Sequence, residues 1–397
     1  MQNLCPAAPG DVAAARLRDP YPYYAWLREH APVFPERKPN GLTVWHVTRY
    51  ADVHDLLADR RLTKRPASVG AGYVSGPAGL QQHLVHADPP EHTRLRRLAN
   101  QAFTARRVAA LTPLVEGMAR DLIARFPREG AVDVIGDFAF PFAYDLIRTV
   151  LGVPGHLDTP AARDLLTASL APVAGAPADL DAGLHAWLTE LIAHKRRAGH
   201  ASGDLLGVLV DACDHGDALT EHELISTAYI LLLVGHDTTV NLIGNGTLAL
   251  LEHPAQWDRL RSDPGLVGTA VEELLRYDSP VRKATFRAAT RPLDLHDVTI
   301  PAGDVVSLAI GSANRDGARF ADPDELDLGR DPNPHLALGR GPHFCIGATL
   351  ARMEAAIAFP LLLERLGTAK LAVAPEDLDW RPSRIMRGLT RLPVLPG

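Results

Sequence analysis

The sequence has few cysteines, and those it has are far apart. Cys5, Cys213 and Cys345 are the three cysteines of the chain, and no C-x-x-C pair occurs. This spacing argues against a disulfide framework and against a structural zinc site. Each cysteine must therefore be judged by its own neighbours.

The sequence also lacks a hydrophobic run long enough to cross a bilayer. Its most apolar stretch, residues 230–234, is followed at once by Gly235, His236 and Asp237, whereas a membrane span needs about 18 apolar residues in succession. Residues 1–20 contain no apolar run flanked by basic residues, so we expect neither a signal peptide nor a membrane anchor. The sequence predicts a cytoplasmic protein without membrane contacts.

An excess of basic residues is absent as well. The chain of 397 residues has 41 Lys and Arg against 47 Asp and Glu, which gives a formal net charge of −6. This balance argues against nucleic acid as a partner. No repeat, low-complexity tract or long linker divides the sequence, so we expect one domain over residues 1–397, acting as a monomer.

Helix start and stop signals dominate the chain from about residue 87 onward. Asp88 is expected to cap a helix that carries His92 and Arg96 on one side, because these two residues are four apart. Residues 220–223 form a second capping box, and the helix that follows is predicted to reach Glu252. A third helix is predicted between Asp263-Pro264 and Tyr277.

Short strand-like segments follow this third helix. Residues 285–289 and 298–310 are rich in strand-forming side chains and are interrupted by Pro301-Ala302-Gly303. Residues 311–347 are rich in proline and glycine, which predicts a long irregular segment of the kind that usually has a function. The expected fold is mainly α (α+β), a large helical domain with a small β-rich region.

One cysteine occurs where a glycine-rich loop meets a helix. Residues 338–347 read Leu-Gly-Arg-Gly-Pro-His-Phe-Cys-Ile-Gly, which places Cys345 between Gly339 and Gly347. Backbone N–H groups in a glycine turn and at a helix start favour a thiolate over a thiol. An isolated cysteine is more often a small buried side chain, but these neighbours predict a thiolate ligand.

This loop resembles the cysteine loop of the cytochrome P450 family, F-x-x-G-x-x-x-C-x-G, with Leu338 in place of the aromatic residue. Three further motifs of that family occur in the same order along the chain. They are His92-x-x-x-Arg96, the segment Val-Gly-His-Asp-Thr-Thr at residues 234–239, and Glu273-x-x-Arg276. Together the four motifs cover most of the chain, and the sequence is identified as a member of the soluble bacterial class of this family, similar to its secondary-metabolite and macrolide-type monooxygenases.

The resemblance implies haem b, with Cys345 as the axial ligand of the iron and O₂ as a co-substrate. It assigns the anionic haem propionates to four basic side chains, with Gly339 and Gly347 allowing the backbone to come close. These four are His92, Arg96, Arg287 and His343.

In the family, an acid–alcohol pair on the long helix delivers protons to oxygen, and by resemblance this pair is Asp237 and Thr238. Gly235 and the threonine hydroxyls would permit a local break in the helix beside the iron. Val234 stands where the family usually has a smaller residue, so extra bulk is expected there. Glu273 and Arg276 are expected to form a structural ion pair, extended by Arg330, that holds the cysteine loop.

The resemblance also implies a distal substrate pocket, mainly apolar and built from several segments. The loops at residues 63–85 and 170–182 contribute to it, and both are rich in small residues that permit movement. The residues expected in the pocket are Val85, Leu233, Val234, Ala284, Thr285, Ile385 and Met386.

The expected reaction is hydroxylation or epoxidation of a hydrophobic small molecule, and we favour a polyketide or macrolide-like intermediate. A steroid or terpenoid fits this pocket almost equally well. The same oxidant also serves aromatic coupling, desaturation and peroxygenation, because these outcomes depend on how the substrate lies over the iron. A haem-binding sensor or carrier, and a helical scaffold without haem, are the alternatives from other classes.

Electrons are expected to come from NAD(P)H through a separate ferredoxin and ferredoxin reductase, because the family motifs take up the length of the chain. These partners would dock on a basic face that includes Arg340, Arg352 and Arg97.

Overall fold

The computed structural model of the protein describes residues 17–68, 77–101, 103–169, 179–199, 204–215 and 219–397. The chain divides into two compact units. The sheet unit comprises Met1–Leu62, Leu111–Phe142 and Thr238–Gly397, and the helical unit comprises Thr63–Ala110 and Ala143–Asp237. One domain over residues 1–397 stays a prediction, and the two units are described separately below.

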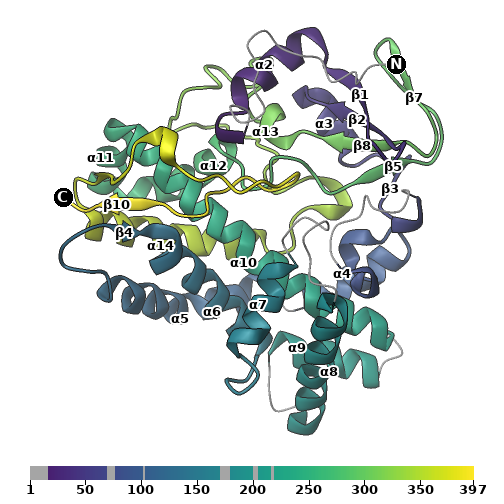
Figure 1. The fold of residues 1–397 in the computed structure, drawn as a ribbon, viewed down its shortest axis with the longest axis horizontal. Helices are drawn as coiled ribbons and strands as arrows, with labels where there is room; N and C mark the ends of the chain where they lie inside the picture. Colours follow the sequence, from purple (N-terminus) through teal and green to yellow (C-terminus); the bar gives the residue numbers. More distant parts are fainter. Residues whose placement is uncertain (1–16, 69–76, 102, 170–178, 200–203, 216–218) are drawn as a thin grey trace. The chain divides into compact units, whose positions relative to one another are not determined.

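Helices make up most of the described chain, as the ribbon in Figure 1 shows. Those of the helical unit are α4 (Glu91–Asn100), α7 (Pro160–Ala168), α8 (Leu180–Ala198) and α9 (Leu205–Asp214). Those of the sheet unit are α2 (Tyr21–His30), α3 (Tyr50–Leu56), α11 (Pro254–Ser262), α12 (Val267–Tyr277), α13 (Ile310–Ala313) and α14 (Ala348–Leu366). Three helices have residues in both units: α5 (Ala105–Ala124), α6 (Phe140–Leu151) and α10 (Glu221–Glu252).

The strands form small sheets. A five-stranded sheet has the order β1-β2-β8-β5-β3, with β1 (Val33–Arg37), β2 (Thr43–Val47), β8 (Val305–Leu308), β5 (Arg287–Ala289) and β3 (Leu62–Thr63). A three-stranded sheet has the order β4-β10-β9, with β4 (Val132–Asp133), β10 (Pro393–Leu395) and β9 (Lys370–Leu371). A hairpin pairs β6 (Leu293–Leu295) with β7 (Val298–Ile300). The predicted mainly α fold with a small β-rich region is confirmed.

The five-stranded sheet closes over a hydrophobic core of the sheet unit. Its parallel pair β2 and β8 aligns Val47 with Leu308. Both side chains are fully buried and share one apolar cluster with Val53 and Leu57 from the chain around α3. The alternation of buried and exposed residues that usually marks a strand is missing from β8, whose four residues are all buried.

The predicted capping box of α10 is confirmed. Glu223 N donates to Thr220 Oγ1 at 3.2 Å, and Thr220 N donates to Glu223 Oε2 at 2.9 Å. These reciprocal bonds fix the start of a helix that ends at Glu252, as expected.

The predicted cap at Asp88 is wrong. Helix α4 begins at Glu91, and the residue before it, Pro90, has no side-chain cap. The Asp88 carboxylate accepts hydrogen bonds from the Thr63 hydroxyl and from Lys64 N. Asp88 therefore fixes the chain after β3 instead of the helix start.

The expected break in α10 near Gly235 is also absent, because the helix runs without interruption from Glu221 to Glu252. A Cβ on Gly235 would lie 2.5 Å from Ile147 Cγ1. This glycine allows close packing of α10 on α6, and does not unwind the helix.

The strands β5, β7 and β8 were expected from residues 285–289 and 298–310. The other strands were missed, namely β1, β2, β3, β4, β6, β9 and β10. Five of these have only two or three residues, too few for a strand pattern to stand out in the sequence, whereas β1 and β2 have five residues each. Within residues 311–347, the regular structure is limited to the end of α13 and a 3₁₀ turn at Gly341–His343, which confirms the predicted irregular segment. No helix among the described residues is both long enough and apolar enough to cross a membrane.

Candidate functional site

Cys345 lies at the end of a tight turn in the sheet unit. Cys345 N donates to Leu338 O at 2.8 Å, and Phe344 N donates to Gly341 O at 3.0 Å. Gly339 and Gly341 have φ values of +76° and +73°, which glycine adopts without the penalty that other residues incur. The glycines of the motif are therefore required by the shape of the turn.

The turn also packs closely against the rest of the sheet unit. A Cβ on Gly341 would lie 2.8 Å from Ala58 Cβ, so no larger residue fits there without movement. After the turn, Gly347 occupies the N-cap position of α14, and Ala351 N donates to Gly347 O at 2.9 Å. Cys345 thus lies two residues before the positive end of a helix of 19 residues, a position that favours a thiolate.

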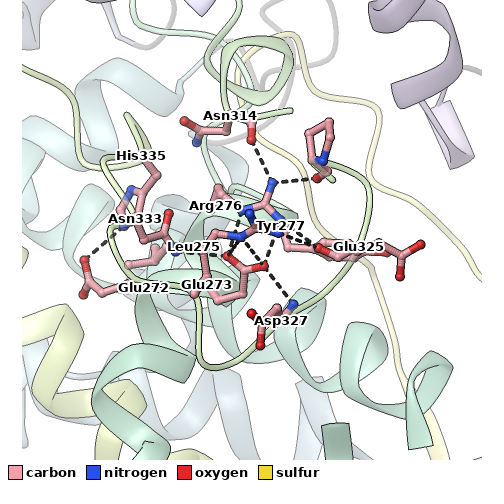
Figure 2. Close-up of polar contacts among 12 residues, drawn as sticks. Glu272, Glu273, Leu275, Arg276, Tyr277, Asn314, Glu325, Asp327, Asn333 and His335 are labelled. Atoms are coloured by element: carbon pink, nitrogen blue, oxygen red, sulfur yellow. Dashed lines mark hydrogen bonds and ion pairs between the residues drawn. The ribbon is translucent and has the colours of Figure 1, made fainter. Parts of the chain in front are cut away.

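Glu273 and Arg276 of α12 form an ion pair, and Figure 2 shows the polar contacts around it. Arg276 Nε lies 2.7 Å from Glu273 Oε2, and neither side chain has any exposed surface. Arg330 Nε donates to the same carboxylate at 3.2 Å, and Asn333 Nδ2 donates to it at 3.0 Å. Arg276 also donates to backbone carbonyls of the irregular segment, those of Asn314, Pro323 and Glu325. The pair therefore fastens residues 314–333 to α12.

A second ion pair, which sequence reasoning missed, lies beside the first. Arg352 of α14 donates to both oxygens of Glu272, at 2.6 and 2.8 Å, and His335 Nε2 lies 3.0 Å from Glu272 Oε2. Although burial alone would raise it, these contacts lower the pKa of Glu272 to about 2. The hydrogen bonds to Glu272 raise the pKa of Arg352, and negative charge on Cys345 adds to this effect. The charge of Arg352 therefore interacts with that of Cys345. The sequence did not reveal that Glu272 pairs with Arg352 and neutralises its charge.

Two more of the expected cofactor residues belong to the sheet unit. Arg287 is buried in β5, and its Nη1 donates to Thr285 O at 3.1 Å. His343 is half-buried in the 3₁₀ turn, two residues before Cys345.

His92 and Arg96 lie on α4 of the helical unit. His92 is 3% exposed, and Arg96 Nε donates to Asn100 Oδ1 at 3.2 Å. Burial lowers the pKa of His92, and the charge of Arg96 lowers it further, with a smaller effect from Lys64.

Sequence reasoning missed a group of basic side chains in the same unit. His83 and His86 lie in and beside the 3₁₀ turn Leu84–His86, with ring centroids 4.4 Å apart, and Lys64 is 2% exposed. Burial, together with the charge of Lys64, lowers the pKa of His83 to about 3. Three histidines within residues 83–92 were the available signal in the sequence.

Asp237 and Thr238 are adjacent in α10. Asp237 is 4% exposed, and Thr238 is half-buried. The next residue, Thr239, makes a side-chain hydrogen bond with Glu354 of α14, another residue that sequence reasoning missed. Burial raises the pKa of Glu354 to about 8, so this carboxyl is mostly protonated at neutral pH.

The cytochrome P450 family model matches residues 265–386 of the chain. Cytochrome P450 107B1 of Saccharopolyspora erythraea is 44% identical over 396 residues, which cover 96% of each protein. The chain belongs to the cytochrome P450 family. The monooxygenase TamI, in a structure with tirandamycin C bound, has a TM-score of 0.90 and 41% identity, covering 97% of this chain and 99% of TamI. The cytochrome P450 PksS of the Bacillus subtilis bacillaene polyketide synthase has a TM-score of 0.89 and 35% identity, covering 96% and 98%.

The chain is therefore a cytochrome P450 monooxygenase with the cytochrome P450 fold, and its family implies a haem-thiolate cofactor. The described residues fit such a group. Phe344, beside Cys345, is 39% exposed, although large apolar residues are usually buried. A Cβ on Gly347 would meet no atom within 4 Å, so the surface beside the cysteine is open. Apolar surface and open space next to a thiol suit a large flat apolar ring.

The expected pocket residues of this P450 fall into two sets. In the sheet unit, Arg282 N and Lys283 N donate to Ile385 O at 2.9 and 3.3 Å, and Val281 forms a β-bridge with Met386. These bonds bring residues 281–285, which include Ala284 and Thr285, beside residues 385–386.

The other three expected pocket residues belong to the helical unit. Val85 lies in the 3₁₀ turn Leu84–His86, and Leu233 and Val234 lie on α10. Val234 is 40% exposed on a helix that is otherwise largely buried. Large parts of the two expected pocket loops, residues 69–76 and 170–178, lie outside the described residues.

Proposed function

We propose that this P450 holds haem through Cys345 and inserts one oxygen atom into a hydrophobic polyketide-like molecule, by hydroxylation or epoxidation. The observation that carries the proposal is the presentation of Cys345. A glycine turn closed by the bond from Cys345 N to Leu338 O places the thiol before the start of α14, beside the exposed ring of Phe344.

A haem with a thiolate ligand supplies an iron that can activate O₂ for transfer of one oxygen atom. Cys345 would hold that iron, and Phe344 would cover part of the ring. Arg287 and His343 of the sheet unit are basic side chains suited to neutralise propionate charge. His92 and Arg96 of the helical unit are proposed for the same role on the family resemblance alone.

The proposed role of Asp237 and Thr238 is to hold and pass protons. The Thr238 hydroxyl can donate a hydrogen bond to an oxygen atom and accept one in return. The Asp237 carboxylate can recharge that hydroxyl through water, because it precedes Thr238 directly on α10.

Three features support a hydrophobic substrate. Val234 presents a branched apolar side chain that is 40% exposed. Ile385 and Met386 are half-buried and lie beside residues 281–285. TamI is bound to tirandamycin C, and PksS belongs to a polyketide synthase system, so a polyketide-like compound is the first class to test.

Electrons are proposed to come from a ferredoxin and its reductase, and ultimately from NAD(P)H. Arg340 supports this docking proposal, because its side chain is 42% exposed in the cysteine turn, five residues before the thiolate ligand, and its nearest carboxylate, that of Asp55 at 3.8 Å, is itself 77% exposed. Arg352 contributes less charge, since Glu272 neutralises it.

The test is a CO difference spectrum of the reduced, haem-loaded protein, for the wild type and for Cys345→Ser. A strongly red-shifted Soret band in the wild type that disappears in Cys345→Ser supports thiolate ligation. Cys213→Ser is the matched control, because Cys213 is an unbridged cysteine on α9, and it should keep the band. A wild-type band typical of histidine or thiol ligation would refute the assignment.

The substrate class is tested next, by titrating the ferric protein with a polyketide macrolactone, a steroid and a terpenoid of similar size. The proposal predicts a spin-state change with the macrolactone at the lowest concentration. Tighter binding of the steroid or terpenoid would contradict the polyketide assignment and leave the haem assignment intact.

A further inference from the structure

A row of polar side chains follows one face of α10 within the sheet unit. Thr238, Asn241, Asn245 and Glu252 are separated by three, four and seven residues, so they lie on the same side of the helix. Asn241 is 0% exposed and Asn245 is 1% exposed. Buried amides of this kind normally have hydrogen-bond partners for both their oxygen and their nitrogen.

These two amides have fewer protein partners than they need. Asn245 Nδ2 donates to Arg387 O at 3.0 Å, but Asn245 Oδ1 has no hydrogen-bond partner in the part of the chain that the structure describes. Neither Asn241 Oδ1 nor Asn241 Nδ2 has one among these residues either. An unpaired buried polar group costs about 1–3 kcal/mol, and ordered internal water is the usual partner that removes this cost.

The backbone opposite Asn241 is kept free of side chains. A Cβ on Gly388 would collide with Asn241 Oδ1. Gly388 follows Arg387, whose carbonyl accepts from Asn245, so residues 387–388 lie along the same face of α10.

The row leads into a cavity of about 390 Å³ in the sheet unit. Asn245, Glu252 and Trp380 are among its lining residues. Trp380 is 7% exposed, and its Nε1 has no hydrogen-bond partner among the described residues. Asp19 and Glu252 are exposed at the rim of the cavity, which therefore communicates with solvent.

The distances along the helix suit single water molecules. At 1.5 Å per residue, Asn245 is about 6 Å along the axis from Asn241, and Asn241 is about 4.5 Å from Thr238. One bridging water spans a gap of this size with two hydrogen bonds.

We propose that water molecules held by Asn241 and Asn245 connect this cavity with Thr238 and deliver protons to its hydroxyl. The inference rests on the proposed function, in which the Thr238 hydroxyl passes protons to oxygen. Insertion of one oxygen atom consumes O₂, two electrons and two protons, and releases one water, with the electrons supplied by a reduced ferredoxin. Without substrate, the same two electrons and two protons convert O₂ to H₂O₂, so the route can be tested before the substrate is known.

The experiment compares haem-loaded wild type with Asn241→Leu, using NADPH and a surrogate ferredoxin and reductase in H₂O and in D₂O. Asn241→Leu keeps the branched shape of the side chain and removes its hydrogen-bonding groups, with some added volume. We expect NADPH consumption to fall by at least about threefold, since a proton-transfer group contributes far more than this. We also expect the solvent isotope effect to increase, which a merely structural role would not cause.

Thr247→Val is the matched control. Thr247 is 2% exposed on the same helix, and its Oγ1 has no partner among the described residues, but it lies roughly a third of a turn from Asn241 and nearly opposite Thr238. This variant should keep the wild-type rate and isotope effect.

The outcomes separate the two proposals. A wild type that binds no haem or consumes no NADPH refutes the proposed function. An active wild type with Asn241→Leu equal to it in rate and isotope effect refutes the water route alone. A crystal structure of the haem-loaded wild type supplies a test that does not depend on the variant folding: ordered water at both amides supports the route, and protein partners in place of water overturn it.

Discussion

Arg276 and Glu273 are bound to each other side by side in α12, with neither side chain exposed to solvent. Arg276 also donates to three backbone carbonyls of the irregular segment, and Glu273 accepts from Arg330, Asn333 and the backbone of Asp327. The attraction within a buried ion pair offsets the free energy needed to remove its charges from water only when the other donors and acceptors of both side chains are also hydrogen-bonded. Its effect is to fix the conformation of the segment that leads to Cys345.

Glu273→Ala is therefore expected to lower the free energy of unfolding by about 3–5 kcal/mol, because Arg276 would stay buried without its counter-charge. Denaturant unfolding measures this loss, and the fraction of purified protein that retains haem should fall with it. Asp258→Asn is the matched control, since Asp258 and Arg261 also form an i,i+3 ion pair but are 62% and 41% exposed. The control should change stability by no more than about 0.5 kcal/mol. Equal losses in the two variants would contradict the anchoring role.

Glu354 predicts a pH dependence of stability. Burial raises its pKa to about 8 in the folded protein, whereas an unfolded glutamate titrates at about 4.3. Between these two values the folded state binds more protons than the unfolded state, so the free energy of unfolding decreases as pH rises.

Glu354→Gln replaces the carboxyl group by an amide that does not titrate. The decrease in the free energy of unfolding that Glu354 causes with rising pH should therefore disappear. Relative to wild type, the variant should gain stability with rising pH, by at most about 1.4 kcal/mol per pH unit, measured by denaturant unfolding from about pH 5 to about pH 8. Glu364→Gln changes an exposed residue of the same helix, so it should follow the wild-type curve. Parallel curves for wild type and Glu354→Gln would mean that the buried carboxyl is already ionised.

Local signals in the sequence predicted the elements and motifs whose causes are local. The capping box at Thr220 and Glu223, the end of α12 at Tyr277 and the glycine turn before Cys345 each depend on neighbouring residues, so their positions could be read directly. Asp88 had the correct residue type for a cap, but its carboxylate bonds to Thr63 and Lys64, about 25 residues earlier. Long-range competition of this kind has no signature in a single sequence.

The missed site residues have the same explanation. Glu272 and Arg352 are 80 residues apart, and each looks like an ordinary surface charge on its own helix. Glu354 is one of two glutamates in its helix, and its burial depends on how α14 packs in the sheet unit. Chemistry that arises from burial can be recognised only when the packing partners are known.

A side chain at position 341 is expected to disturb the packing of the turn next to Cys345. Gly341→Ala must adopt φ near +73° and place a methyl group 2.8 Å from Ala58 Cβ. We expect a loss of stability of more than about 1 kcal/mol and faster loss of haem to a haem acceptor such as apomyoglobin. Gly268→Ala is the control, because Gly268 lies exposed in α12 with no atom near its Cβ position, and it should stabilise the protein by up to about 1 kcal/mol. Wild-type haem retention in Gly341→Ala would show that the turn tolerates a side chain.

The charge of Arg352 is expected to affect the reduction potential of the haem iron independently of protein stability. Its guanidinium interacts with negative charge on Cys345 and is paired with Glu272. Arg352→Gln removes a positive charge from the neighbourhood of the thiolate and should therefore favour the ferric state and make the reduction potential more negative. Spectroelectrochemical titration of the haem-loaded protein measures this shift. Arg259→Gln removes an arginine that is paired with Asp327, with no effect on Cys345 expected, and should keep the wild-type potential. An unchanged or more positive potential in Arg352→Gln would contradict this electrostatic role of Arg352.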